Sequence, residues 1–404
     1  MKVLVINCGS SSLKYSLFNV PQSRPLFEGL IEKIGSASPL HKIKTSGGKT
    51  ERQDGVKDIG EAFLKMEHAL VSEEFGVLKS LNEIQAVGHR VVHGGDRFSA
   101  SVVIDKQVKD AIRDCCTLAP LHNPYNLSGI EEMEKILPET SAVAVFDTAF
   151  HQTMSEHVYR YALPYALCDE KHIRRYGFHG TNHKYVSLAA AMYLNRPTEE
   201  LKLITCHLGN GASICAIDGG RSVDTSMGLT PLEGLIMGTR GGDIDPGVIL
   251  YLMREGYTAA DIDTVLNKES GLKGVTGTSN DMREVLELSK DGNQRAKLAV
   301  SMFAYRIKKY IGAYVSILGG LDALIFTGGI GENSNEIRGG VCSGLEHLGI
   351  RISDNLNKAA RAVRGEVTDI SNNGSPSRVL IVPADEERMI TRETIRALQR
   401  HSNT

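Results

Sequence analysis

The chain has 404 residues, of which 41% are hydrophobic and 23% are charged, so we expect a globular protein of two or three domains. Its formal net charge of −2 argues against a protein that binds nucleic acid. Seven cysteines at scattered spacings, no long apolar run and no signal-peptide pattern predict a reduced, cytoplasmic protein without a membrane span.

The first predicted element is a β-hairpin. Val3–Ile6 is an apolar, β-branched run typical of a buried strand, and Leu13–Phe18 alternates as a half-buried strand does. The turn between them, Asn7–Ser12, consists of small residues that let backbone N–H groups approach an anion. Lys14 adds a mobile positive charge, and Asn7 offers a neutral oxygen near a metal ion or its water. The hairpin is either an ordinary Ser-rich turn or a phosphate-binding turn, but it is no P-loop, because the Gly-Lys-Ser/Thr signature is absent.

Further along, helical spacing is predicted over 61–70, 76–81 and 105–118. Arg90 lies inside an apolar strand that begins near Ala86, where an unpaired arginine would be costly. It is therefore either a salt-bridged structural residue or part of a site. Asp147 follows the buried strand Ser141–Phe146, and ligands of open α/β sheets gather at the carboxyl ends of strands. The alternative for Asp147 is a turn or helix N-cap.

The second half repeats the opening pattern. His179 precedes a helix predicted over 182–194, at a helix N-terminus where anions bind readily. Residues 203–220 then form a buried strand, a small-residue turn and an outgoing strand, followed by a third strand over 221–226. The two hairpins indicate a duplicated architecture.

The remaining elements are loops between helices and strands. Arg240 lies in a glycine-rich loop over 238–247, and a helix is predicted to begin near Asp281. A long helix over 294–318 precedes a strand over 323–327 and a Gly-rich turn that opens a helix. A last strand is expected over 378–383 and a terminal helix from Asp385 to about Arg400.

These motifs together closely resemble the acetate kinase family, within the superfamily of sugar kinases, actin and Hsp70 ATPases. The resemblance runs along essentially the whole chain, over Asn7–Tyr15, Gly88–Gly95, Ala119–Pro124, Phe146–His151, Tyr176–Tyr185, His207–Gly211, Gly238–Pro246 and Phe326–Ser334. It implies an α/β chain with the duplicated ribonuclease H-like (actin-like ATPase) fold, in two lobes with a central cleft. The lobes implied are 1–150, with a C-terminal helix of about 386–400 packing back on it, and 151–385, which binds the nucleotide.

The same resemblance implies an ATP:acetate phosphotransferase that uses Mg²⁺ or Mn²⁺ and acts as a cytoplasmic homodimer. Arg90 and Arg240 resemble the pair that binds the carboxylate and the transferring phosphoryl group. His179 and Asn210 resemble phosphoryl ligands in the transition state, and Asp147 resembles the family's essential acidic residue.

Further positions match binding residues of the family. Asn7 and Glu386 match the magnesium positions. The implied nucleotide contacts are Lys14, His207, Leu208, Gly209, Asn210, Gly211, Asp281, Met282, Arg283, Gly329, Ile330, Gly331, Glu332 and Asn333. The implied substrate contacts are Arg90 and His122, with a small apolar pocket for the methyl group made by Val92, Leu121, Phe178 and Pro231.

The chain departs from the family's pattern in three places. Asn182 stands where Ser is usual, Gly241 where Cys or Ser is frequent, and Ala384–Arg388 differs from the more usual Thr-Asn-Glu-Glu-Leu. The third departure bears on the magnesium position of Glu386, although both glutamates are present.

The reaction implied is direct in-line transfer of the γ-phosphoryl group of ATP to a carboxylate oxygen. A carboxylic acid with a pKa of about 4 is ionised at neutral pH and needs no general base. We therefore expect Asp147 to orient magnesium-bound water or an arginine, so that Asp147→Asn alters the magnesium dependence of the rate. Two alternatives remain open: a propionate or butyrate kinase of the same family, and a non-catalytic ATP-binding module of the actin or Hsp70 type.

Overall fold

The structure is a computed structural model that describes residues 1–404 except 23, 54 and 404. Contacts within the chain divide it into two compact units. Unit 1 comprises Met1–Gln152 and Glu386–Thr404, and unit 2 comprises Thr153–Asp385.

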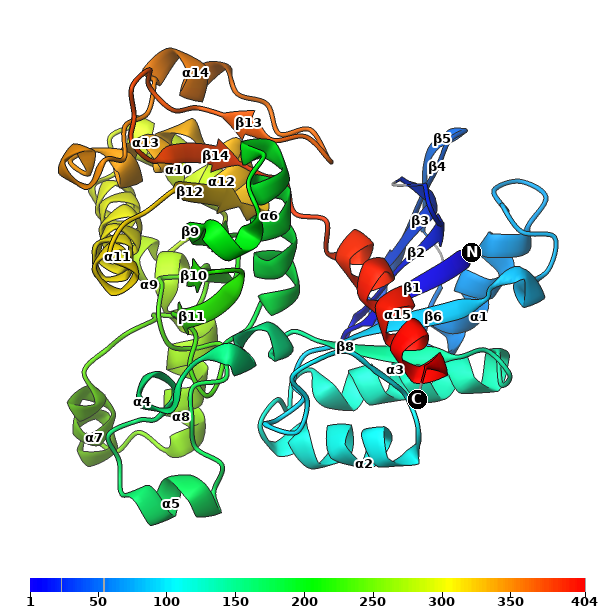
Figure 1. Cartoon of the computed structure of the whole chain (residues 1–404). Helices are drawn as coiled ribbons and strands as arrows, with labels where there is room; N and C mark the ends of the chain where they lie inside the picture. The colour runs from blue at the N-terminus through cyan, green and yellow to red at the C-terminus, as the bar shows by residue number, and fades with distance from the viewer. Residues whose placement is uncertain (23, 54, 404) are drawn as a thin grey trace. The chain divides into compact units, whose positions relative to one another are not determined.

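Unit 1 is built on an eight-stranded sheet with the order β5-β4-β3-β2-β1-β6-β8-β7 (Figure 1). The first three strands form an antiparallel meander, whereas β6 and β8 run parallel to β1. The strand bounds are β1 Lys2–Cys8, β2 Ser12–Asn19, β3 Pro25–Glu32, β4 Leu40–Thr45, β5 Gly48–Gln53, β6 Ala86–Val91, β7 Val102–Val103 and β8 Ala142–Phe146.

Helices cover both faces of this sheet. Leu4 and Ile6 of β1 belong to a core with α1 and α3, whereas Val5 packs with Ile390 of α15. Side chains alternate across a strand, so a continuous apolar run is what a strand buried on both faces requires. The helix bounds are α1 Ile59–Val71, α2 Lys106–Asp114, α3 Asn123–Ile136 and α15 Glu386–Ser402.

Unit 2 repeats this strand topology. Its six-stranded sheet has the order β11-β10-β9-β12-β14-β13, in which β9, β10 and β11 form an antiparallel meander and β12 and β14 run parallel. The strands are β9 Lys202–Leu208, β10 Ala212–Asp218, β11 Arg221–Thr225, β12 Ala323–Thr327, β13 Thr368–Asp369 and β14 Arg378–Ile381. The order β11-β10-β9-β12-β14 matches β3-β2-β1-β6-β8, which confirms the predicted α/β class and duplication.

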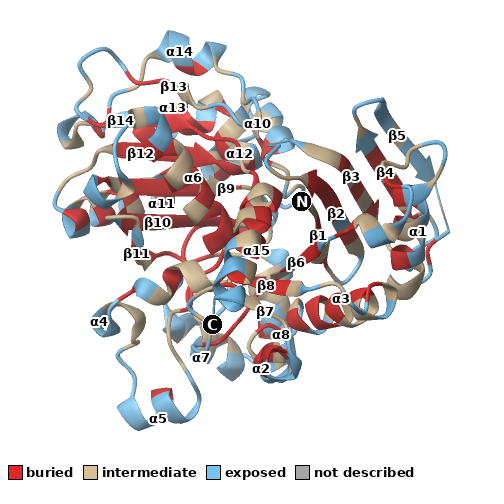
Figure 2. Cartoon of the chain, turned by 45° about the vertical axis from the view of Figure 1, so that its right-hand side comes forward, coloured by how far each residue is buried: buried red, intermediate tan, exposed pale blue. Residues whose placement is uncertain are grey.

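Helices α6 and α11 contact strand β9 of the second sheet, and buried residues concentrate on the strands of each unit (Figure 2). The helices of unit 2 are α4 Glu156–Tyr159, α5 Tyr165–Glu170, α6 Gly180–Leu194, α7 Pro246–Arg254, α8 Ala259–Thr264, α9 Gly271–Thr276, α10 Met282–Lys290, α11 Gln294–Leu318, α12 Gly328–Asn333, α13 Asn335–Cys342 and α14 Asp354–Ala359. Among the described residues, no helix is both long and apolar enough to cross a bilayer.

Some predicted helices differ in the structure. The helix predicted over 76–81 is wrong: the backbone N–H groups of Val77 and Leu78 both donate to the carbonyl oxygen of Leu70, at the end of α1, and only a 3₁₀ turn over Leu81–Glu83 follows. The helix predicted over 105–118 ends at Asp114 and continues as a 3₁₀ turn. Helix α6 begins at Gly180, two residues before its predicted start.

Candidate active site

Charged side chains gather where β1, β6 and β8 of unit 1 end. Arg90 donates from Nε and Nη2 to Oδ2 of Asp147, at 3.1 and 2.5 Å, and from Nη1 to Oδ1 of Asn7 at 3.4 Å. Glu386, the first residue of α15, lies 3.8 Å from Arg90 Nε, measured from its Oε2. Because these parallel strands share an edge, residues far apart in sequence meet there.

Burial and neighbouring charges shift the pKa values of Glu386 and Arg90 in this cluster. Burial, helped by the negative charges of Asp147 and Glu387 and opposed by the positive charge of Arg90, raises the pKa of Glu386 to about 7. Burial alone would lower the pKa of Arg90, but the charges of Asp147 and Glu386 outweigh this effect and raise it. Lys14 forms an ion pair with Glu387.

The donor set of this cluster fits a hard divalent cation. Oδ1 of Asn7 and the carboxylate of Glu386 offer oxygen atoms, which Mg²⁺ prefers as ligands. Within the described ranges, no group of three or more His, Cys, Asp and Glu side chains could hold a metal ion alone. A metal ion here would therefore keep water or substrate oxygens as further ligands, as Mg²⁺ commonly does.

In unit 2, His179 lies directly before α6. It has a left-handed backbone (φ +57°), and its side chain makes no capping hydrogen bond to the helix. Its Nδ1 lies 2.9 Å from Oγ of Ser213 on β10, and its ring stacks on that of His207, with centroids 4.2 Å apart.

Arg240 and His179 border the same space next to Gly211. A Cβ atom built on Gly211 would lie 3.5 Å from Arg240 Nη2 and 3.6 Å from His179 Nε2. Nη1 of Arg240 donates to the carbonyl oxygen of Pro231 at 2.5 Å, and burial lowers the pKa of this arginine. Since Gly211 has no side chain, an anion could approach both donors there.

Asn210 lies beside this space, in the turn of the second hairpin. Its Oδ1 accepts a hydrogen bond from Asn280 Nδ2 at 2.9 Å, and its carbonyl oxygen accepts one from Gly238 N at 2.9 Å. The turn therefore holds the loop that leads to Arg240.

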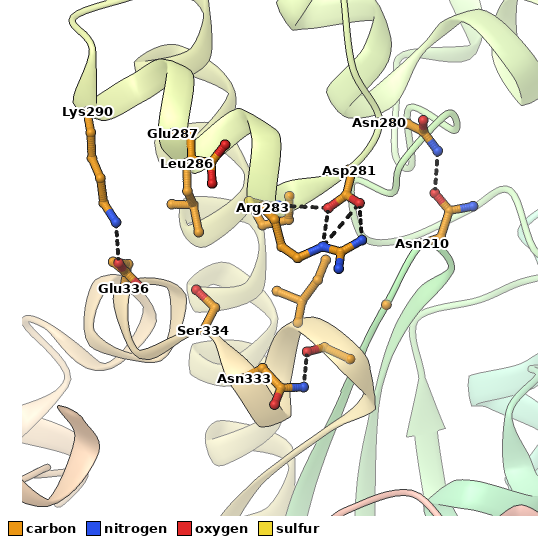
Figure 3. A pocket seen from close by; sticks show the side chains of 14 residues that line it. Asn210, Asn280, Asp281, Arg283, Leu286, Glu287, Lys290, Asn333, Ser334 and Glu336 are labelled. Carbon is orange, nitrogen blue, oxygen red and sulfur yellow. Dashed lines mark hydrogen bonds and ion pairs between the residues drawn. The ribbon is translucent and has the colours of Figure 1, made fainter. Parts of the chain in front are cut away.

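A pocket of about 690 Å³ adjoins this turn (Figure 3). Of the nucleotide contacts implied by the sequence, its lining includes Gly209, Asn210, Asp281, Met282, Arg283, Gly329, Ile330 and Asn333. The carboxylate of Asp281 caps α10 and holds the guanidinium of Arg283, with Nη2 of Arg283 at 2.5 Å from Oδ2 of Asp281. The implied contacts that do not line this pocket are Lys14, His207, Leu208, Gly211, Gly331 and Glu332.

Six residues of the pocket lining were not predicted from the sequence, namely Asn280, Leu286, Glu287, Lys290, Ser334 and Glu336. Leu286, Glu287 and Lys290 follow Arg283 by three, four and seven residues, so they share its face of α10, and that spacing could have identified them. Lys290 pairs with Glu336 at 2.9 Å, a partner that no local pattern reveals (Figure 3).

Two further residues support the Gly-rich turn. Oε1 of Glu332 accepts hydrogen bonds from the backbone N–H groups of Gly328 and Ala384, each at 2.9 Å. Arg338, which is fully buried and was missed from sequence, donates from Nη1 to the carbonyl oxygens of Gly331 and Glu332.

The residues predicted for an apolar substrate pocket differ in exposure. In unit 1, Val92 is buried, Leu121 is 63% exposed, and His122 is the N-cap of α3. In unit 2, Phe178 is buried and Pro231 is half-buried.

Comparisons with known proteins agree along the whole chain. A model of the acetokinase family matches residues 2–392. The chain is 53% identical over 396 residues to the acetate kinase of Alkaliphilus metalliredigens, covering 98% of the chain and 99% of the relative. It is 52% identical to that of Methanosarcina thermophila, covering 98% and 96%.

Solved structures give the same result. The crystal structure of Porphyromonas gingivalis acetate kinase superposes with a TM-score of 0.93 at 48% identity, covering 98% of this chain and 99% of that one. A propionate kinase from Francisella tularensis gives a TM-score of 0.91 at 43% identity, with the same coverage.

Proposed function

The chain belongs to the acetokinase family, and from this premise we propose that it transfers the γ-phosphoryl group of ATP to the carboxylate of acetate, reversibly, giving acetyl phosphate and ADP. The observation that carries the proposal is the arrangement in unit 2, where the pocket lined by the implied nucleotide contacts adjoins the space bordered by Arg240 and His179. The nucleotide would occupy this pocket, with its phosphates toward the turn at Asn210.

Arg90 binds the acetate carboxylate in this proposal. A guanidinium matches a carboxylate in a bidentate geometry. Asp147 holds Arg90 through two hydrogen bonds and is itself 1% exposed, so its position supports a role in orienting the arginine. Because acetate is already ionised at neutral pH, no proton needs to be removed from it.

Arg240, His179 and Asn210 stabilise the transferring phosphoryl group. Its transition state is loose and spreads negative charge over the equatorial oxygens, so catalysis rests on positioned donors rather than on covalent chemistry. We expect one in-line displacement, with net inversion at a chiral γ-phosphorus; net retention would indicate a phospho-enzyme.

Asn7 and Glu386 are the residues that would hold Mg²⁺ or Mn²⁺, in the cluster that also contains Asp147 and Glu387. When bound, the metal ion supplies positive charge against the phosphate oxygens.

The protein is further proposed to act as a cytoplasmic homodimer. Helix α7 supports this, because none of its residues is buried within the chain, although Val248, Leu250, Tyr251 and Met253 are apolar and more than 40% exposed. Clustered exposed apolar side chains are typical of protein interfaces. Light scattering coupled to size-exclusion chromatography would measure the mass directly.

The decisive experiment traps the acyl phosphate with hydroxylamine, in reactions that contain ATP, Mg²⁺ and a series of short-chain carboxylates. Hydroxamate formation that is fastest with acetate would support the proposal. A higher kcat/KM with propionate or butyrate would favour the sister activity, for which the Francisella propionate kinase is a structural neighbour. One methylene is worth only about 1–3 kcal/mol of discrimination, so the full series is needed. ATP binding without carboxylate-dependent turnover would refute both activities.

A further inference from the structure

A continuous line of hydrogen bonds runs through unit 2 and ends at His179. Oγ1 of Thr205, on β9, lies 2.7 Å from Nδ1 of His183, on α6. Nε2 of His183 lies 2.8 Å from Oγ of Ser213, on β10, and that oxygen lies 2.9 Å from Nδ1 of His179. Thr205, His183 and Ser213 are each 0% exposed, so water cannot replace these contacts.

The two hydroxyl groups determine the direction of this line. A hydroxyl group carries one hydrogen, and a buried one must find an acceptor. Among the described residues, the side chain of Thr205 has a hydrogen-bond partner only in His183 Nδ1, so Thr205 donates to that nitrogen. A neutral ring that accepts at Nδ1 carries its proton at Nε2, so His183 donates to Ser213.

Ser213 then has one acceptor left for its own hydrogen. If Ser213 accepted from both rings, its hydrogen would have no acceptor within the part of the chain that the structure describes. Ser213 therefore donates to Nδ1 of His179, and the proton of the neutral His179 ring resides on Nε2.

We infer that Thr205, His183 and Ser213 form a relay that holds His179 as the neutral Nε2–H tautomer, with Nε2 on the side of the ring that faces Gly211. The inference rests on the proposed role of His179 and specifies it. The ring meets the phosphoryl group with a hydrogen-bond donor rather than with a lone pair. Ser213 and His183 are thus positioning residues that act through His179.

The geometry explains why the tautomer matters. Nε2 of His179 and Nη2 of Arg240 border the same space, lying 3.6 and 3.5 Å from a Cβ atom built on Gly211. A lone pair on Nε2 would repel an anionic oxygen there, whereas an N–H group donates to it. Enzymes that hold a histidine in the wrong tautomer lose orders of magnitude in rate with little change in structure.

Nuclear magnetic resonance reads the tautomers directly, without any activity. The full-length protein is labelled with ¹⁵N-histidine, and His179 and His183 are assigned from the variants His179→Gln and His183→Gln. We expect Nε2 to be protonated and Nδ1 to be unprotonated in both rings. A spectrum in which His179 carries its proton on Nδ1, or exchanges between the two tautomers, would overturn the inference.

Kinetics then tests whether the relay acts through His179. We expect Ser213→Ala to lower kcat by about 10-fold or more, with the KM for ATP within about 2-fold, since one donor to the transition state is misplaced. In the His179→Ala background, the same substitution should change kcat by less than about 2-fold. If Ser213→Ala lowers kcat equally in both backgrounds, its role is merely structural and the inference fails.

Thr205 provides a matched pair of substitutions at the start of the relay. Thr205→Val keeps the shape and removes the hydroxyl, whereas Thr205→Ser keeps the hydroxyl and removes a methyl group. Only Thr205→Val should alter the imidazole resonances of His183 and lower kcat; equal effects of both would contradict the relay. If His179→Ala retains full activity, the proposed role of His179 fails, while the resonance spectrum still decides the tautomer.

Discussion

Replacing Asp147 by Asn tests whether this carboxylate orients Arg90 or acts as a base. The change keeps an oxygen acceptor of the same size and removes one negative charge. Asp147 is 1% exposed, and the side chain of Arg90 is 19% exposed. Two unit charges about 4 Å apart interact by about 4 kcal/mol at an effective dielectric constant of 20.

Because the asparagine oxygen retains part of the hydrogen bonding, we expect Asp147→Asn to lower the free energy of unfolding by about 2–3 kcal/mol. The chain offers a matched control in Asp114, which accepts from Arg97 at 2.9 Å with side chains that are 61% and 57% exposed. Asp114→Asn should cost less than about 1 kcal/mol, because exposed ion pairs contribute little. Urea denaturation of both variants and the wild type measures the difference.

The kinetic consequence follows from the same contact. An Arg90 side chain without its partner binds acetate less well, and a loss of about 1.4 kcal/mol raises the KM for acetate about tenfold. The pH profile of kcat should keep its shape, because no proton is abstracted from acetate. The role of Asp147 in orienting Arg90 is refuted if Asp147→Asn costs no more stability than Asp114→Asn. It is also refuted if the variant loses only one limb of the pH profile at unchanged KM.

Three further predictions concern other parts of the chain. Gly211→Ala should change the free energy of unfolding by less than about 1 kcal/mol, because the added Cβ lies at an ordinary contact distance of 3.5 Å from Arg240 Nη2. The same Cβ fills the space where an anion would bind, so kcat/KM should fall more than about 10-fold. A loss of stability as large as the loss of activity would contradict this. Arg338→Met removes a charged donor to the carbonyl oxygen of Gly331, so urea denaturation should show a free energy of unfolding that is lower by about 2–3 kcal/mol. Titration calorimetry should show a weaker affinity for ATP. An unchanged affinity would show that the Gly-rich turn does not depend on Arg338. Burial lowers the pKa of His89 to about 3, so below about pH 6.5 this ring is protonated in the unfolded chain but still neutral in the folded chain. The free energy of unfolding therefore falls as the pH drops below about 6.5. Between pH 7 and pH 5 the wild type should therefore lose about 2 kcal/mol more than His89→Leu in urea denaturation, and parallel losses would show that His89 does not titrate on unfolding.

Local chemistry explains why much of the fold could be predicted from the sequence. The opening hairpin follows from an apolar β-branched run, a turn of small residues and an alternating strand, and β1 and β2 pair accordingly. The long helix α11 has the bounds that its apolar spacing predicts, because helical periodicity over many residues is a strong signal. The helix predicted over 76–81 is wrong because the backbone N–H groups of Val77 and Leu78 donate to the carbonyl oxygen of Leu70, at the end of α1. The sequence of 76–81 itself does not indicate this contact.

Residue types and spacings alone determined the strands, the paired hairpins, the α/β class and the resemblance to one family, because turn chemistry and hydrophobic periodicity act over a few neighbouring residues. Only the tertiary structure decided which side chains meet. It brought Asp147 to Arg90, and Ser213 between His183 and His179, by ordering strands that are far apart in the chain. Such pairings depend on strand order and register, which are set by burial over whole sheets rather than by any local stretch.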